Sequence, residues 1–319
     1  MDALSDVLHA VRLKGAVFFH LQVSTPWVAE TPPAPEIAGR IFPGIDHLIP
    51  YHVVTEGMCW GGPLDGPATR LESGDIIMFP HGDAHVMSSA PGMRQKPDLS
   101  LYRRPEDGRL PFSVEIGQSG SDPGRVVCGY LVCDARPFNP LLASLPPVIH
   151  VRDGDGGPLH TLVRFAVEES ATPRLGGEST LARVSELLFV EVVRRYIERL
   201  PQEQTGWLAG LRDPHVGRAL TALHQNPAKA WSLDLLGREA GLSRSALAER
   251  FTALVGQPAM HYLTSWRMQL AANRLVNGAD GVAEIAALVG YESEAAFSRA
   301  FKKAVGVAPG QWRRHRSVA

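Results

Sequence analysis

The spacing of apolar residues divides this chain into a strand-rich first half and a helix-rich second half. Between about residues 15 and 150, short apolar stretches rich in β-branched and aromatic residues alternate with turn-forming Pro, Gly and Asp, which predicts antiparallel strands. From about residue 158 the apolar positions recur at helical spacing. We therefore predict an α+β protein with an N-terminal β-barrel or sandwich. The clearest strand segments read AVFFHLQV, HLIPYHVV, DIIMFP and RVVCGYLV.

The helical part contains one pattern twice, at an offset of fifty residues. A repeat of this length predicts two copies of one small fold. In each copy a short helix, a glycine turn and a serine-capped second helix predict a helix-turn-helix, a motif that enters the DNA major groove. The repeated positions are Ser243, Leu247, Phe251, Gly256 and Tyr262 in the first copy and Ser293, Phe297, Phe301, Gly306 and Trp312 in the second.

Residues 259–276, between the two copies, also have a helical pattern. A helix of this length spans about 27 Å. Because equivalent major grooves on one face of a duplex are about 34 Å apart, such a helix would hold two recognition helices near one DNA turn apart. One protomer is therefore expected to read two successive grooves of double-stranded DNA.

A further predicted helix covers residues 178–200 and ends just before Pro201. A helix with an apolar stripe must bury that stripe against another element. The pattern leaves two partners open, namely the barrel of the same chain and a helix of a second protomer in a dimer. The stripe comprises Leu181, Val184, Leu187, Leu188, Glu191, Val192 and Ile197.

Composition and charge fit a protein that meets nucleic acid through its C-terminal part. The 319 residues, 45% hydrophobic and 20% charged, suffice for about two globular domains. From residue 210 onward, 14 Lys and Arg stand against 8 Asp and Glu, a net charge of +6, while the remainder carries −7. A basic tail favours contact with phosphate, although +6 over 110 residues is also the charge of an ordinary, mildly basic domain.

The chain has no apolar run long enough to cross a bilayer. Its first fifteen residues, MDALSDVLHAVRLKG, have apolar positions at helical spacing and lack the order of a secretory signal. We therefore expect no membrane partner and a cytoplasmic location.

The C-terminal motifs resemble the DNA-binding domain of the AraC/XylS family of bacterial transcription regulators. The resemblance covers residues from about 212 to 316 and is carried by AGLSRSALAERF, YLTSWRMQLAANRLV and IAALVGYESEAAFSRAFKKAVGVAPGQWR. It implies a DNA-binding domain at residues 212–319. The polar, Gly-containing stretch PQEQTGWLAGLR before it predicts a linker at 201–211, which leaves residues 1–200 as the sensor and dimerisation domain. The resemblance also implies RNA polymerase as a partner if the protein is an activator.

By this resemblance, both second helices carry base-facing residues, flanked by capping serines and by lysines placed for phosphate contacts. Arginine suits guanine, glutamate can accept from the cytosine amino group, and alanine can contact the thymine methyl. For Arg299, a phosphate contact or an ion pair with Glu294 remains open. The predicted DNA-binding set is Ser243, Arg244, Ser245, Ala248, Glu249, Ser293, Glu294, Ala295, Ser298, Arg299, Lys302 and Lys303.

Three further arginines, Arg313, Arg314 and Arg316, are also candidates for phosphate contact or for plain solvated charge. Gly237 stands where the resemblance leads us to expect alanine. Glycine in a helix interior costs up to about 1 kcal/mol, so this position bears on stability rather than on DNA binding.

The segment GDIIMFPHGDAH resembles the second sequence motif of cupin barrels. Upstream, His52 and Glu56 resemble part of the first motif, but Pro50 occupies the place of its leading histidine. Proline cannot ligate a metal, so the three-histidine-plus-glutamate site of enzymatic cupins is incomplete. The set formed by His52, Glu56 and His85 leaves metal binding open against ordinary, hydrogen-bonded histidines, and no cofactor is expected.

The three cysteines, Cys59, Cys128 and Cys133, are too few for a disulfide framework and are expected to be reduced thiols. Cys128 and Cys133 lie five positions apart on one predicted strand, so their side chains face opposite sides of the sheet, which disfavours a bridge between them. Cys59 pairing with either across the barrel would make a redox sensor. The alternative is that all three are small buried hydrophobes.

These features favour a sequence-specific DNA-binding transcription regulator, a homodimer and not an enzyme, that responds to a small-molecule effector or chemical signal through a cupin-like barrel. The alternative is a metal-dependent cupin enzyme fused to a DNA-binding tail, against which Pro50 weighs. The candidate effector or signal residues are His52, Glu56, Cys59, His81 and His85.

Overall fold

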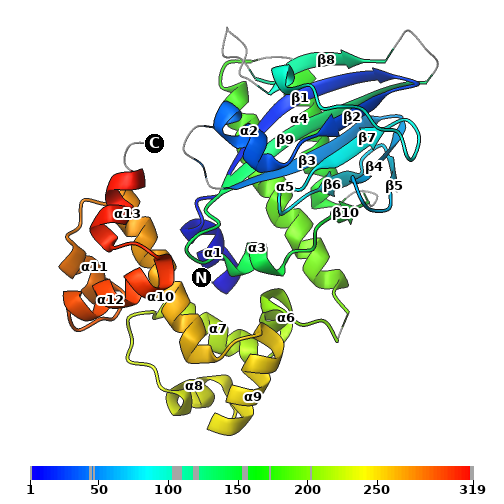
Figure 1. Ribbon diagram of the computed structural model, residues 1–319. Helices are drawn as coiled ribbons and strands as arrows, with labels where there is room; N and C mark the ends of the chain where they lie inside the picture. The colour runs from blue at the N-terminus through cyan, green and yellow to red at the C-terminus, as the bar shows by residue number, and fades with distance from the viewer. Residues whose placement is uncertain are drawn as a thin grey trace. The chain divides into compact units, whose positions relative to one another are not determined.

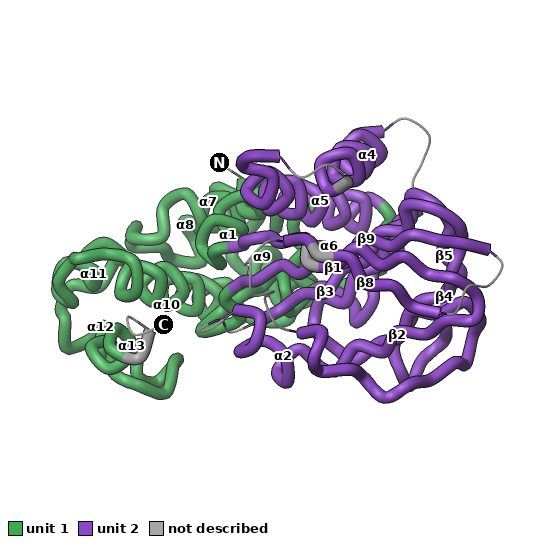
Figure 2. Tube along the Cα trace, turned by 90° about the horizontal axis from the view of Figure 1, so that it is seen from above, with its two compact units in different colours: residues 1–12, 134–144, 199–319 green, residues 13–133, 145–198 purple. Residues whose placement is uncertain are grey.

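The computed structural model describes residues 2–42, 45, 47–102, 110–117, 122–152, 157–171, 174–201 and 203–316. The chain forms two compact units, coloured separately in Figure 2. Unit 1 comprises residues 1–12, 134–144 and 199–319, and unit 2 comprises residues 13–133 and 145–198. Residues 1–12 and 134–144 thus belong to the same compact unit as residues 199–319. The domain boundaries at residues 200 and 212 stay a prediction.

Unit 2 contains two β-sheets with the strand orders β10-β6-β3-β9-β1-β8 and β2-β7-β4-β5. The described ladders are antiparallel except that of β1 with β8. The predicted strand-rich N-terminal part is confirmed. The strands are β1 (Lys14–Ser24), β2 (Val28–Thr31), β3 (His47–Glu56), β4 (Met58–Pro63), β5 (Thr69–Glu72), β6 (Ile76–Met78), β7 (His85–Ser88), β8 (Phe112–Ile116), β9 (Pro123–Cys133) and β10 (Ile149–Val151).

The core of unit 2 is formed by side chains of both sheets, including Leu21, Ile77 and Met87, with Ile37 from helix α2 (Ala34–Ile41). Alternate residues of a strand face opposite sides of its sheet. The central strands β3 and β9 are nonetheless buried on both faces. Helices must therefore cover the outer face of the larger sheet.

Helix α5 (Gly177–Arg199) covers part of that outer face. The Tyr51 hydroxyl and the Ser185 hydroxyl are 2.6 Å apart and hydrogen-bonded. A Cβ atom added to Gly15 would lie 2.5 Å from Ser185 Cβ, so glycine is needed for this close approach. The predicted helix thus buries its stripe on its own barrel, although Leu187 is left 53% exposed.

The remaining helices of unit 2 are short or lie beside the sheets (Figure 1). They are the 3-10 helix η1 (Leu99–Leu101) and helix α4 (Pro158–Ala171). Val163 and Val167 of α4 line hollows together with Val54 and Thr55 of β3. α4 therefore packs on the same sheet as α5.

Unit 1 is helical and contains both predicted helix-turn-helix motifs, α8 with α9 and α11 with α12, joined by α10 (Figure 1). The turns contain Gly241 and Gly290 in left-handed conformations, with φ of 70° and 83°. The helices are α1 (Ala3–Ala10), α3 (Pro140–Ser144), α6 (Trp207–Arg212), α7 (Val216–Gln225), α8 (Leu233–Ala240), α9 (Arg244–Val255), α10 (Ala259–Asn277), α11 (Val282–Leu288), α12 (Glu294–Val305) and α13 (Pro309–Arg316).

Gly237, in the middle of α8, has a structural reason. A Cβ atom at this position would lie 2.8 Å from the Leu242 carbonyl oxygen. The Gly237 carbonyl also accepts a 2.9 Å hydrogen bond from the Leu242 amide. Glycine therefore permits the tight turn of the first motif, which offsets its cost in the helix.

The start of the chain belongs to the same compact unit as these motifs. The side-chain amide of Gln269 on α10 is buried, donates to the Ala10 carbonyl at 3.2 Å and accepts from the Phe138 amide at 3.0 Å. One turn further on, Asn273 also donates to Ala10, at 3.0 Å. These bonds satisfy the carbonyl at the end of α1. They make residues 1–12 and 134–144 part of the unit.

Candidate DNA interface and barrel cavity

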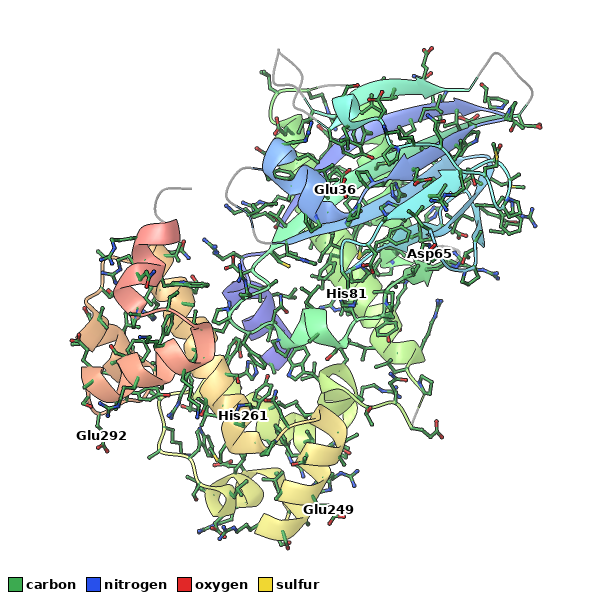
Figure 3. All side chains as sticks on the ribbon, viewed as in Figure 1. Glu36, Asp65, His81, Glu249, His261 and Glu292 are labelled. Carbon is green, nitrogen blue, oxygen red and sulfur yellow. The ribbon has the colours of Figure 1, made fainter. Side chains whose placement is uncertain are left out.

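The second helix of the first motif, α9, is held by one face and exposes the other. Ser243 caps it by accepting a 3.3 Å hydrogen bond from the Ala246 amide, and Leu247 and Phe251 are fully buried. The predicted residues Arg244, Ser245 and Glu249 are exposed, and Ala248 is half-buried. The Glu249 side chain points away from the other helices of its motif (Figure 3).

The second helix of the second motif, α12, repeats this arrangement. Ser293 accepts a 3.2 Å hydrogen bond from the Ala296 amide, and Phe297 and Phe301 are fully buried. The predicted residues of this helix lie on its open side: Glu294, Ala295, Arg299, Lys302 and Lys303 are exposed, and Ser298 is half-buried.

The basic residues near these helices fall into two groups. Arg244 lies 3.7 Å from Asp234 in an exposed ion pair, which is too weak to withhold it from DNA. Arg299 has no ion-pair partner among the described residues. In contrast, the Arg250 guanidinium donates to Asp213, at 2.9 Å from its Nε, and thus ties α9 to the start of α7.

Arg267 in the middle of α10 connects the two motifs. Its guanidinium donates to the carbonyls of Pro227 at 2.7 Å, Lys229 at 3.0 Å and Gly290 at 3.4 Å. A Cβ atom added to Gly290 would lie 2.6 Å from the Ala228 carbonyl oxygen, so the two segments touch. This role cannot be predicted from the sequence, because Arg267 differs in no local feature from a solvated helix arginine.

Arg313, considered above for phosphate contact, donates to the carbonyls of Leu275 and Asp280. These bonds join α13 to the end of α10 and give Arg313 a structural role, while its contact with phosphate stays a prediction. Arg314 is exposed. The side chain of Arg316 lies outside the described residues.

Unit 2 contains a cavity of about 390 Å³ between its two sheets. This volume is in the range of pockets that bind small molecules. Strands β1, β2, β3, β8 and β9 and the segment 95–102 form its walls. The lining residues are Phe19, Leu21, Val28, Ala29, Glu30, His52, Gln95, Lys96, Asp98, Leu101, Tyr102, Val114, Glu115, Ile116, Gly117, Cys128 and Tyr130.

Two histidines and a cysteine form a hydrogen-bonded chain at this cavity. The His85 Nδ1 atom is 2.8 Å from the Asp83 carbonyl oxygen, which can only accept, so Nδ1 carries the proton. His85 Nε2 must then accept from His52 Nε2, 2.8 Å away. His52 Nδ1 in turn accepts from the Cys128 thiol at 2.9 Å. The Asp83 carbonyl thus fixes every proton position in this series of hydrogen bonds.

Burial keeps all three side chains of this chain uncharged. It lowers the pKa of His52 far below its ordinary value and that of His85 to about 4, and it raises the pKa of the Cys128 thiol. The Phe79 ring stacks on the His85 ring with centroids 3.8 Å apart and adds to the exclusion of water. At neutral pH the imidazoles are therefore neutral and the sulfur is a thiol.

The other predicted effector residues lie elsewhere. Glu56 is exposed and forms an ion pair with Arg125 at 3.2 Å. The β3–β9 register shifts between Val54 and Glu56, and such a bulge changes the face to which the next side chain points. Cys59 is buried in the core without lining the cavity.

His81, labelled in Figure 3, donates to the Leu145 carbonyl at 2.9 Å and does not line the cavity either. The suggested metal set of His52, Glu56 and His85 is thus not assembled. Within the described part of the chain, no three His, Cys, Asp or Glu side chains converge as metal ligands. The three cysteines are free thiols and buried. The structure instead joins His52 to Cys128, a contact between β3 and β9 that depends on strand register.

None of the described helices combines the length and apolar character that a membrane span requires.

Comparison with known proteins identifies both parts of the chain. A cupin family model matches residues 2–198, and a helix-turn-helix domain model matches residues 236–315. An AraC-like transcription regulator of Streptomyces lividans is 33% identical over 99% of both chains. The regulator AlkR of Acinetobacter baylyi is 29% identical over 98% of this chain and 99% of its own. The RCS-specific activator RclR of Escherichia coli is 25% identical over 98% and 97%.

These relatives are transcription regulators and not enzymes. They match almost the whole chain, including the barrel. The alternative interpretation as a cupin enzyme with a DNA-binding tail is therefore not supported.

Proposed function

Because this chain belongs to the AraC-type transcription regulators with an N-terminal cupin domain, we propose that it reads a specific DNA sequence through α9 and α12 and responds to a small molecule held in its barrel cavity. One observation carries this proposal. Two serine-capped helices of one unit each bury two large apolar side chains and expose a polar face.

The two exposed faces are expected to read different bases. The face of α9 offers Arg244 and Glu249, whereas that of α12 offers Glu294 and Arg299 in the opposite order along the helix. Arginine pairs with guanine and glutamate with the cytosine amino group. Since α10 has 19 residues and spans about 28 Å, the preferred site consists of two unlike halves near one DNA turn apart.

Chain continuity supplies a route from cavity to DNA-reading unit. Strands β1 and β9 both line the cavity and enter unit 1 at Arg12 and Asp134, respectively. There the Arg12 guanidinium donates two 2.7 Å hydrogen bonds to the Asp134 carboxylate, and a third bond of 3.3 Å reaches Asn277 at the end of α10. A ligand that shifts either strand would act on this junction. The coupling free energy between ligand and DNA binding then equals the difference in ligand affinity between the DNA-binding and the non-binding state of the protein.

We further propose that the protein is a homodimer. Helices α4 and α5 expose large apolar side chains, Phe165 at 42% and Leu187 at 53%. Exposed apolar side chains on helices that already pack on a barrel suit a second contact surface. RNA polymerase would be a further partner if the protein activates transcription, and the cytoplasm remains the predicted location.

The proposal is tested by selecting bound sequences from random DNA with the full-length protein. We expect enrichment of an asymmetric site whose halves lie about 10 bp apart. Selection is then repeated with Arg244→Ala and with Arg299→Ala as a matched pair, each of which should relax a different half. A folded protein that enriches no sequence would contradict the assignment of α9 and α12.

A further inference from the structure

The inner wall of the barrel cavity offers no free N–H donor from its imidazole. His52 is the imidazole that lines the cavity, and both of its nitrogens are used, one by Cys128 and one by His85. Cys128 gives its thiol proton to His52, so its sulfur presents only lone pairs to the cavity. A carboxylate or phosphate placed beside these two residues would lose its hydration without gaining a donor from His52 or Cys128.

The charged residues of the cavity also oppose an anion. Among the described lining residues, three are acidic (Glu30, Asp98 and Glu115) and one is a cation, Lys96. Lys96, Asp98 and Glu115 are exposed and therefore lie at the mouth in contact with solvent. The nearby Arg94 is occupied by Glu30, with Nε and Oε2 2.8 Å apart. Among the described lining residues, no positively charged side chain therefore lies at the inner wall beside His52 and Cys128.

The walls between mouth and inner end are apolar and aromatic. Phe19 and Tyr102 meet edge to face with ring centroids 5.8 Å apart. Leu21, Val114 and Ile116 complete the surface from β1 and β8. Removing apolar ligand surface from water is worth about 25 cal/mol per Å², so this part of the cavity supplies the affinity.

From these three features we infer that the cavity takes an uncharged, largely apolar small molecule and rejects carboxylates and other anions of the same shape. This inference rests on the proposed function of the cavity and names its ligand class. The selectivity comes from His52 and Cys128 of the inner wall, which are bonded to each other and to His85 and carry no charge.

The test uses three probes with one skeleton: 4-phenylbutan-1-ol, 4-phenylbutanoate and 4-phenylbutylammonium. Their binding to the full-length protein is measured at neutral pH by displacement of the uncharged fluorophore N-phenyl-1-naphthylamine. We expect the alcohol to bind at least tenfold more tightly than the carboxylate. Equal or tighter binding of the carboxylate overturns the inference and leaves the proposed function standing. If neither the fluorophore nor any probe binds, the cavity is not a ligand site and the proposed response to a small molecule fails as well, whereas the proposed DNA reading by α9 and α12 is unaffected.

A substitution at Cys128 tests the inner wall directly. In Cys128→Ala, His52 Nδ1 loses its donor and becomes an acceptor that faces the cavity. The ratio of the affinity for the alcohol to the affinity for the hydrocarbon butylbenzene should then be at least fivefold higher than in the wild type. The carboxylate should remain excluded. The matched control is Cys133→Ala, which lies on the same strand but does not line the cavity. If this affinity ratio changes equally in both variants, or does not change in Cys128→Ala, the assignment of Cys128 and His52 to the inner wall is contradicted. If Cys128→Ala does not fold, the three probes on the wild-type protein decide the inference.

Discussion

The cavity of unit 2 and the recognition helices of unit 1 use polar side chains in opposite ways. In the cavity, His52, His85 and Cys128 are buried and bonded to one another. On α9 and α12, residues such as Arg244 and Arg299 are exposed. Polar groups that satisfy each other stabilise the fold, whereas outward-facing groups remain available to a partner. Substitutions in the two regions should therefore separate protein stability from DNA affinity.

The largest effect is expected from His52→Ala. This change leaves the Cys128 thiol and His85 Nε2 without their partner and opens space in the core, and each of these costs free energy. We expect the opening free energy of β3 and β9, measured by hydrogen exchange, to fall by about 2–4 kcal/mol. DNA affinity should change little. The control Glu56→Ala, at an exposed site, should change stability by less than about 0.5 kcal/mol.

Acid should destabilise the protein through the same histidines. The folded-state pKa of His85, about 4, lies below the ordinary histidine value. As pH falls from about 6.5 towards 4, the unfolded chain therefore binds a proton that the folded chain does not. The free energy of unfolding should fall in this window by about 1.4 kcal/mol per pH unit for this imidazole.

Urea unfolding followed by circular dichroism, in the wild type and in His85→Gln, measures that contribution. The buried His224 in unit 1, whose pKa burial lowers to about 3, adds a similar term to both proteins and cancels in the difference. Identical pH dependence in the two proteins would show that His85 is not held neutral.

On the recognition helices, Arg299→Ala should weaken binding at one half-site by about 1–3 kcal/mol and relax base preference there. Its stability should stay within about 0.5 kcal/mol of the wild type, because the side chain is exposed. Affinity is measured on matched DNA sites that differ only at the contacted base pair. An equal loss on every sequence would reassign Arg299 to a phosphate contact.

The smallest effect is expected from Lys302→Gln and Lys303→Gln. Both lysines are exposed on the last turns of α12. If a lysine binds a DNA phosphate, its replacement should lower affinity on all sequences and reduce the slope of log affinity against log salt by about 1. A salt titration of DNA binding with both variants provides the measurement. An unchanged slope in both would leave these lysines as solvated charge.

Local sequence signals were sufficient for the helix-turn-helix motifs. Serine caps, glycine turns and the repeated apolar positions act within a few residues, so the pattern indicates them directly. The cavity could be predicted from the sequence only in part. His52 and His85 stand out in motifs, but the bulge after Val54 that turns Glu56 outward has no comparable signal. Gly237 and Arg267 also gained their roles only through contacts with other segments.

The sequence by itself therefore determined the α+β class, the two repeated motifs and the strand-rich barrel, because each depends on local periodicity. The tertiary structure decided which distant side chains meet: Cys128 with His52, Arg12 with Asp134, and Gln269 with Ala10. These contacts depend on strand register and helix packing between residues up to 259 positions apart. No local pattern specifies them, because each is selected by the energy of the whole packed unit.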